Sequence, residues 1–199
     1  MNKLKLGFLA SHGGSNMQSI IDACKSGKIN AVPVVVISNN SNSLALERAK
    51  NEGIPSYHIS QKKYPDPDSL DKAIIDVLEK YEVDLVILAG YMKKLGNKVI
   101  QRFKGKILNI HPALLPKYGG EGMYGRFVHE AVIENKEKES GCTVHIVDEV
   151  YDHGRILGQA KVPVLPEDTP ETLAARVLEQ EHLLYPSIIG KIASGEIII

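Results

Sequence analysis

The sequence predicts an α/β protein built on a doubly wound, mostly parallel sheet, and two observations lead to this prediction. Short apolar runs alternate with segments of helical periodicity, giving the order βαβαβαβ as far as Ala89. The last of these runs, Leu85–Ala89, is apolar without interruption, as in a parallel strand covered on both faces. Right-handed crossovers would then place helices on both faces of a Rossmann-like N-terminal half. Ligands of such sheets bind beyond the carboxyl ends of the strands.

Length and composition are those of an ordinary globular protein. With 199 residues, 43% of them hydrophobic and 24% charged, one domain over residues 1–199 is expected. Lys plus Arg and Asp plus Glu number 24 each, so the zero formal charge gives no sign of a nucleic-acid or membrane surface. Two cysteines, Cys24 and Cys142, are too few for a disulfide framework and show no metal-ligand spacing. We expect buried thiols, no metal and, without an apolar run of membrane-span length, a cytoplasmic protein.

The first strand ends in a glycine-rich turn that is a candidate anion site. The apolar run Leu4–Ala10 is followed by Ser-His-Gly-Gly-Ser-Asn at residues 11–16, and then by apolar residues at helical spacing, Met17, Ile20, Ile21 and Cys24. The free N–H groups at a helix start attract an anion, and glycines let a ligand approach the backbone. Two interpretations stay open: the turn binds a phosphate, or Ser15 or Asn16 is a plain N-cap.

Three further elements complete the first half. A strand over Val32–Ile37, interrupted by Pro33, leads to a helix that is closed by Gly53. A brief strand, Ser56–Ile59, precedes an amphipathic helix from Asp68 onward, with apolar residues at Leu70, Ile74, Val77, Leu78 and Tyr81. Parallel strands then bring three polar or glycine-rich exits to one sheet edge, namely Gly13–Asn16, Gly90–Met92 and Asn109–His111.

Asn109-Ile110-His111-Pro112 marks the end of a strand. Side chains alternate along a strand, so Asn109 and His111 project together toward a pocket while Ile110 turns into the core. Pro112 cannot extend the hydrogen-bond ladder. From these residues alone, the pair is either a polar contact that fixes a loop, or an oxyanion stabiliser beside a general acid/base.

The second half carries two irregular stretches. Ala113–Arg126 is too glycine-rich and irregular for a buried element and is typical of a binding loop or lid. A helix over Phe127–Asn135 follows, and then strands over Gly141–Asp148 and Ile156–Val164. Between these strands lies Asp152-His153, which on its own is typical of a solvated Asx-type turn.

The last helix begins cleanly and contains one unexpected carboxylate. Thr169 is a good N-cap, and Pro170 suits the first helical position. Glu181 falls within the apolar arc of Leu173, Val177, Leu184 and Ile188. A carboxylate there is costly without a partner, so Glu181 is either a ligand contact or a member of an internal ion pair.

Taken together, these motifs resemble the phosphoribosylglycinamide formyltransferase family over nearly the whole chain. The motifs are Ser11–Asn16, Leu88–Met92, Asn109–Lys117, Val144–Glu149 with Asp152, and Gln180–His182. The Asn-Ile-His-Pro-x-Leu-Leu-Pro block is specific for the formyltransferase superfamily, which includes methionyl-tRNA and sugar formyltransferases. The Gly-Ser-Asn turn separates the nucleotide enzymes from these.

The resemblance implies a site for each substrate. Gly14, Ser15 and Asn16 would hold the ribonucleotide phosphate and Glu181 the ribose hydroxyls, with the N-terminal half, about residues 1–100, binding the ribonucleotide. Asn109, His111 and Asp152 would be catalytic, in a C-terminal half of about residues 101–199 that carries the catalytic and folate-binding loops. The folate would lie beside Tyr91, Met92 and Leu95 and against the backbone of Val147, Asp148, Glu149, Val150 and Tyr151.

The implied reaction moves the formyl group of 10-formyltetrahydrofolate, a co-substrate, to the amine of glycinamide ribonucleotide in de novo purine synthesis. Asn109 and a protonated His111 would stabilise the oxyanion, and Asp152 would raise the imidazole pKa and carry the proton. Alternatives are a formyltransferase for an amino sugar nucleotide, a 10-formyltetrahydrofolate hydrolase, and a non-catalytic binding module. Small-molecule substrates and a monomer or homodimer are expected.

Four features depart from the family pattern. His12 stands where a glycine is usual, His153 precedes Gly154 where the family often has two glycines, and Tyr91 replaces a frequent Phe. The segment Gly119–Arg126 is longer than in better-known members and lacks their histidine. Substrate contacts in that loop therefore cannot be transferred from the family.

Overall fold

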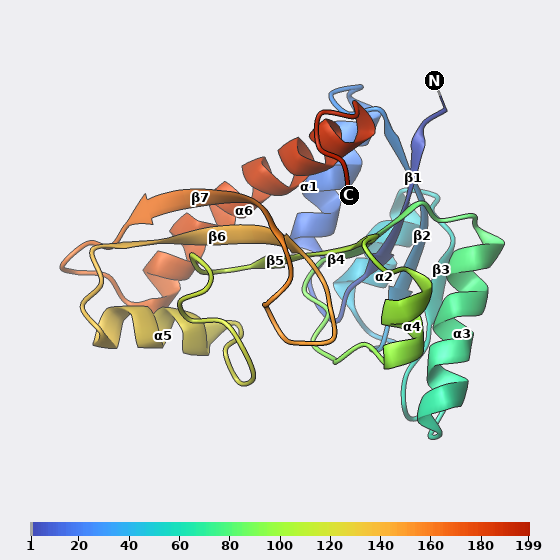
Figure 1. Ribbon diagram of the computed structural model, residues 1–199, viewed down its shortest axis with the longest axis horizontal. Coiled ribbons are helices and arrows are strands. Elements are labelled where there is room, and N and C mark those ends of the chain that lie inside the picture. The colour runs from blue at the N-terminus through green and yellow to red at the C-terminus, as the bar shows by residue number, and fades with distance from the viewer. Residues whose placement is uncertain (1) are drawn as a thin grey trace.

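One mixed sheet of seven strands runs through residues 2–199, the part of the chain that the computed structural model describes (Figure 1). The strand order is β3-β2-β1-β4-β5-β6-β7; β1 to β5 are parallel, whereas β6 runs antiparallel to both neighbours. The strands are β1 (Leu4–Leu9), β2 (Ala31–Ser38), β3 (Ser56–His58), β4 (Leu85–Leu88), β5 (Ile107–His111), β6 (Glu139–Ile146) and β7 (Ile156–Pro163). The predicted mostly parallel α/β sheet is confirmed.

Six helices cover the sheet, and their first turns explain where they begin. They are α1 (Ser15–Lys25), α2 (Leu44–Asn51), α3 (Pro67–Lys80), α4 (Asn97–Arg102), α5 (Arg126–Glu134) and α6 (Pro170–Ala193). The side chains of Ser43 and Asp66 accept N–H groups of α2 and α3, and Thr169 forms a capping box at α6, as predicted for an N-cap. The short helix α4 was not predicted, because six residues are too few for a periodic pattern. Strand β6 begins and ends two residues before the predicted bounds, Gly141–Asp148.

The two faces of the sheet have separate cores. Helices α1, α2, α5 and α6 contribute buried apolar residues to one core, and α3 and α4 to the other. Leu108 and Ile110 of β5 belong to the first core, and Ile107 belongs to the second. The remaining β5 side chains, Asn109 and His111, therefore lie on the face that α3 and α4 cover. Both cysteine thiols are buried, as predicted, and burial raises the pKa of Cys142 to about 12.

The hydroxyl of Tyr185 links α6 to the neighbouring strands β4 and β5. Its ring is fully buried, and its hydroxyl contacts the carbonyls of Leu88 and Leu108 at 3.1 and 3.0 Å. A buried hydroxyl needs a partner, and this one links α6 to the end of β4 and the start of β5. No helix among residues 2–199 is long and apolar enough to cross a membrane.

Tyr185→Phe should destabilise the protein while leaving the ring in place. The substitution removes the only donor of this link, so the free energy of unfolding should fall by about 1–3 kcal/mol. Tyr124→Phe, which removes a hydroxyl from a residue that is 51% exposed, is the matched control and should change stability by less than about 0.5 kcal/mol. Urea denaturation measures both, and equal stabilities for the two variants would contradict the role of the Tyr185 hydroxyl.

Candidate active site

The end of β5 presents two polar side chains on one face, as its alternation predicts. Ile110 is 8% exposed and packs in the core beneath α1 and α6, while Asn109 and His111 project from the opposite face. Asn109 lines a hollow at the carboxyl edge of the sheet. His111 is only 4% exposed and does not line that hollow, so the prediction that both side chains face the pocket is correct for Asn109 alone.

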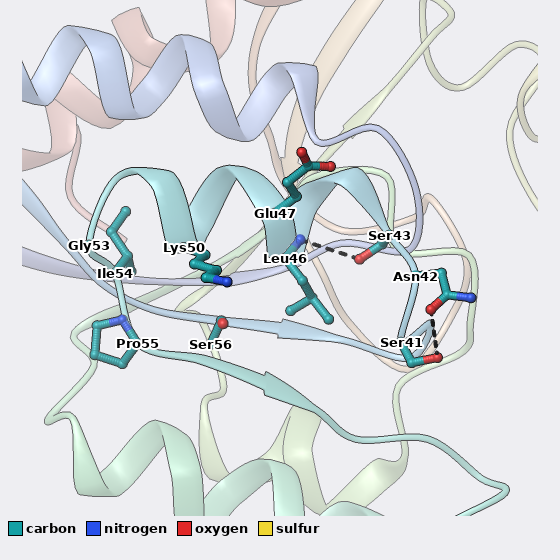
Figure 2. Close-up of a pocket in the computed structure, with 10 residues that line it drawn as sticks. All are labelled: Ser41, Asn42, Ser43, Leu46, Glu47, Lys50, Gly53, Ile54, Pro55 and Ser56. Carbon is teal, nitrogen blue, oxygen red and sulfur yellow. Dashed lines mark hydrogen bonds between the residues drawn. The ribbon is translucent and has the colours of Figure 1, made fainter.

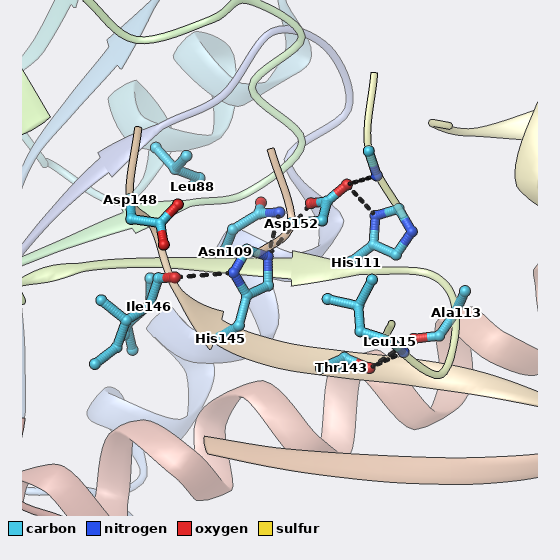
Figure 3. A network of polar contacts seen from close by, with 12 residues as sticks. Leu88, Asn109, His111, Ala113, Leu115, Thr143, His145, Ile146, Asp148 and Asp152 are labelled. Atoms are coloured by element: carbon cyan, nitrogen blue, oxygen red, sulfur yellow. Dashed lines mark hydrogen bonds and ion pairs between the residues drawn. The ribbon is translucent and has the colours of Figure 1, made fainter. Parts of the chain in front are cut away.

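Strand β6 adds a second histidine, which was not predicted as a site residue. The antiparallel register places His145 opposite Asn109 and Thr143 opposite His111. Across that pair, Asn109 Nδ2 lies 3.2 Å from His145 Nε2 (Figure 3). His145 Nδ1 lies 3.0 Å from the carbonyl of Ile146; because a carbonyl oxygen only accepts, Nδ1 carries a proton. With Nδ1–H directed to that carbonyl, Nε2 is the acceptor for the Asn109 amide, which fixes the orientation of the amide.

Thr143 and the carbonyl of Tyr118 fix the chain that follows β5. The hydroxyl of Thr143 donates to Ala113 O at 2.6 Å and accepts Leu115 N–H at 3.1 Å. Farther along, Tyr118 O lies 2.7 Å from His111 Nε2, so Nε2–H donates a hydrogen bond to this carbonyl. The ring of His111 is thereby held with Nε2 toward the loop and Nδ1 toward Asp152.

Asp152 joins these groups from the turn between β6 and β7. Its Oδ2 lies 3.5 Å from His111 Nδ1 and accepts Gly120 N–H at 3.0 Å, while Oδ1 lies 3.4 Å from His145 Nε2 (Figure 3). Its backbone φ is 54°, in the left-handed region that side chains rarely adopt. The side chain is 11% exposed, so a solvated Asx-type turn is the wrong interpretation for Asp152, although His153 beside it is exposed.

Burial and the neighbouring groups shift the pKa values of the pair. Burial raises the pKa of Asp152, but the two histidines and the N–H of Gly120 lower it by more, so the net pKa of Asp152 is lowered. Burial lowers the pKa of His111 below its ordinary value, against the opposing effect of Asp152. Asp152 thus acts on the pKa of His111 in the expected direction, but the effect of burial is larger.

Most of the predicted folate-binding residues line a hollow beside this cluster. Seven of the eight line it: Tyr91, Leu95, Val147, Asp148, Glu149, Val150 and Tyr151. Met92 does not; it is 41% exposed, and its N–H donates to Ser11 Oγ at 2.7 Å. Leu88, Ile100, Lys93 and Lys94 line the hollow in addition, and so do Asn109, His145 and Asp152. The hollow therefore opens onto the polar cluster.

The glycine-rich turn and Glu181 lie together although they are far apart in sequence. Gly14, with φ 68°, is the N-cap of α1 and makes no side-chain cap, so the N-cap interpretation of Ser15 and Asn16 is wrong. Asn16 Nδ2 instead donates to Glu181 Oε2 at 2.6 Å. Glu181 is 7% exposed and in no ion pair among residues 2–199; burial raises its pKa to about 7, against the hydrogen bond from Asn16. The ion-pair interpretation of Glu181 is therefore wrong.

A second, shallow groove holds none of the predicted site residues. It lies between α2 and the segment that leads into β3, and Figure 2 shows Lys50, Glu47 and Leu46 among the side chains that line it. The groove therefore lies apart from the polar cluster at the end of β5.

The fold and the cluster define an α/β domain with Asn109, His111, His145 and Asp152 gathered at the carboxyl edge of its sheet. The formyl transferase family matches residues 4–189, and the chain belongs to this family.

Within this family, the chain is similar to several proteins named for one enzyme. The chain is 47% identical to phosphoribosylglycinamide formyltransferase of Haemophilus influenzae over 97% of the chain and 89% of that protein. It is 45% identical to the chloroplastic enzyme of that name from Arabidopsis thaliana, covering 97% of the chain but only 66% of that protein's length. The crystal structure of glycinamide ribonucleotide transformylase 1 from Symbiobacterium toebii superposes with a TM-score of 0.93 at 39% identity, covering 100% of the chain and 91% of that structure.

The ionisation of His111 should be measurable by NMR in the ligand-free protein. Because burial disfavours the imidazolium, its titration midpoint should lie below the ordinary value of 6.5. Asp152→Asn removes a charge that favours the imidazolium, so the midpoint should fall further. A wild-type midpoint above 6.5 would show that burial is not the dominant influence, and a rise in the variant would show that Asp152 does not favour the imidazolium.

Proposed function

We propose that the chain transfers the formyl group of 10-formyltetrahydrofolate to the amine of glycinamide ribonucleotide in de novo purine synthesis. The observation that carries the proposal is the contact of ionised Asp152 with His111 at the rim of the hollow that Asn109 lines. The relatives that bear the name of this enzyme support the choice of substrates.

The acid/base chemistry follows from the protonation of these groups. Neutral His111 has its Nδ1 lone pair directed toward Asp152, so the pair can accept the proton that the attacking amine loses, directly or through water. The resulting imidazolium is stabilised by the Asp152 carboxylate on one side and the Tyr118 carbonyl on the other. The same proton then passes to the departing folate nitrogen.

Asn109 stabilises the negative charge that develops on the formyl oxygen. One of its two amide protons is engaged by His145, and the other is free to donate to the oxyanion. A donor held in place before the reaction needs no reorganisation when the charge develops. His145 is thereby a positioning residue for Asn109.

The binding residues fit the two substrates. The N–H groups of Gly14, Ser15 and Asn16 at the start of α1 suit the phosphate, and the Glu181 carboxylate suits the paired hydroxyls of ribose. The hollow beside Asn109 is lined by the apolar side chains of Leu88, Leu95, Ile100 and Val147 and by the carboxylates of Asp148 and Glu149, a combination that suits a pterin. Residues 1–199 act as one domain, although Glu181 comes from the C-terminal half.

The proposal includes a cytoplasmic location and a monomer or homodimer, with no nucleic-acid partner. Size-exclusion chromatography with light scattering distinguishes a monomer or a homodimer from a larger assembly.

Purified protein should release tetrahydrofolate only when both substrates are present. Asp152→Asn should lower kcat by about 100-fold or more, because the variant can neither accept the proton nor stabilise the imidazolium. Asp76→Asn is the matched control; Asp76 is an exposed residue of α3 that pairs with Lys72 and does not line the hollow, so kcat should stay within about threefold. Formate release without the ribonucleotide would indicate a hydrolase, and a fully active Asp152→Asn would refute the proton-transfer role.

The KM for the ribonucleotide should depend on the ionisation of Glu181. With a pKa of about 7, this carboxyl passes from mostly neutral at pH 6 to mostly ionised at pH 8, where it accepts both ribose hydroxyls. The KM should therefore fall by up to about tenfold over that range. Glu181→Gln, which cannot ionise, corrects for titration of the phosphate itself. An equal pH dependence in both proteins would exclude Glu181 as its source.

A further inference from the structure

Helix α2 holds two successive carbonyls of the glycine-rich turn. Ala45 N–H donates to His12 O at 3.0 Å, and Arg48 Nε–H donates to Gly13 O at 2.9 Å. Residues 45 and 48 lie one helical turn apart, so they form one face of α2 toward the turn. Gly14 packs against the same face: a Cβ there would lie 2.9 Å from Ala45 Cβ.

These contacts determine where the N–H groups of the turn point. In a trans peptide the carbonyl of one residue and the N–H of the next point in opposite directions. With the carbonyls of His12 and Gly13 held by α2, the N–H groups of Gly13 and Gly14 point away from it. The N–H groups of Ser15 and Asn16 belong to the first turn of α1. They have no helical acceptor, because the first hydrogen bond of the helix runs from Gln18 N–H to Gly14 O. Within residues 2–199, these four N–H groups donate to no protein acceptor.

Arg48 contributes charge as well as a hydrogen bond. It is half-buried, and no carboxylate among the described residues lies within ion-pair distance of it. An arginine that holds a main-chain carbonyl and has no acidic partner keeps its full positive charge beside the turn. Lys50 on the same helix points elsewhere, into the shallow groove of Figure 2.

We propose that Arg48 is a positioning residue for phosphate recognition. Arg48 holds the Gly13–Gly14 peptide so that the N–H of Gly14 faces the phosphate. The positive charge of the guanidinium strengthens the attraction of the turn for the phosphate. The inference rests on the proposed function, since it names the side chain that prepares the ribonucleotide's phosphate site. Because Arg48 does not belong to the cluster around Asp152, it should affect ribonucleotide binding and leave the chemical step intact.

Steady-state kinetics separate this role from a merely structural one. Arg48→Met should raise the KM for glycinamide ribonucleotide by about tenfold or more, with kcat and the KM for the folate within about twofold of wild type. Arg48→Lys should recover part of the loss, because it restores the charge without the planar donor. Lys50→Met, the control for general charge, should leave all three constants unchanged. An unchanged ribonucleotide KM in Arg48→Met, a loss confined to kcat, or an equal effect of Lys50→Met would overturn the proposal.

Binding of inorganic phosphate tests the same inference without turnover. In 15N NMR spectra of the wild-type protein, phosphate should shift the amide signals of Gly13 and Gly14, and the dissociation constant should rise by about tenfold in Arg48→Met. Dispersed spectra of the variant would establish that it is folded. Absent shifts in the wild type, or equal dissociation constants, would overturn the role of Arg48. A wild-type protein that binds phosphate but does not formylate the ribonucleotide would instead refute the proposed function alone.

Discussion

The site depends on one buried carboxylate, Asp152, which joins three segments that the sequence separates. It contacts His111 at the end of β5, His145 on β6 and the N–H of Gly120 in the glycine-rich loop. A carboxylate removed from water is costly unless it has partners, and here Oδ2 accepts the N–H of Gly120 while both oxygens face histidine rings. The left-handed backbone at Asp152 persists because the surrounding contacts determine it.

The antiparallel return of β6 is what builds the cluster around this carboxylate. Because β6 runs antiparallel to β5, His145 lies opposite Asn109 and Thr143 opposite His111. One histidine thus orients the amide, and the threonine fixes the chain after Pro112. At the other end of the site, the bond between Asn16 and Glu181 joins the start of α1 to α6. The two halves of the domain therefore both contribute to the proposed ribonucleotide site.

Local patterns in the sequence were sufficient for the sheet and for part of the site. Alternation along residues 107–111 predicts the opposite directions of Asn109 and Ile110, and the helix start predicts the free N–H groups near Gly14. His145 was missed because alternation gives its face but not the strand it pairs with, which is a long-range property. The net pKa of His111 was missed because burial cannot be read from neighbouring residues. His12 stands where the family usually has a glycine. Its φ lies outside the left-handed region, so the turn does not require a glycine at this position.

In the proposed function, Asn109, His111 and Asp152 surround a single point at which the amine meets the formyl group. A crystal structure with glycinamide ribonucleotide and a folate analogue that cannot transfer its one-carbon group measures this arrangement directly. We expect the amine within hydrogen-bond distance of Asp152, or of a water bound to it, and the formyl-equivalent oxygen accepting from Asn109. Ligands bound with the amine and that oxygen remote from both side chains would contradict it.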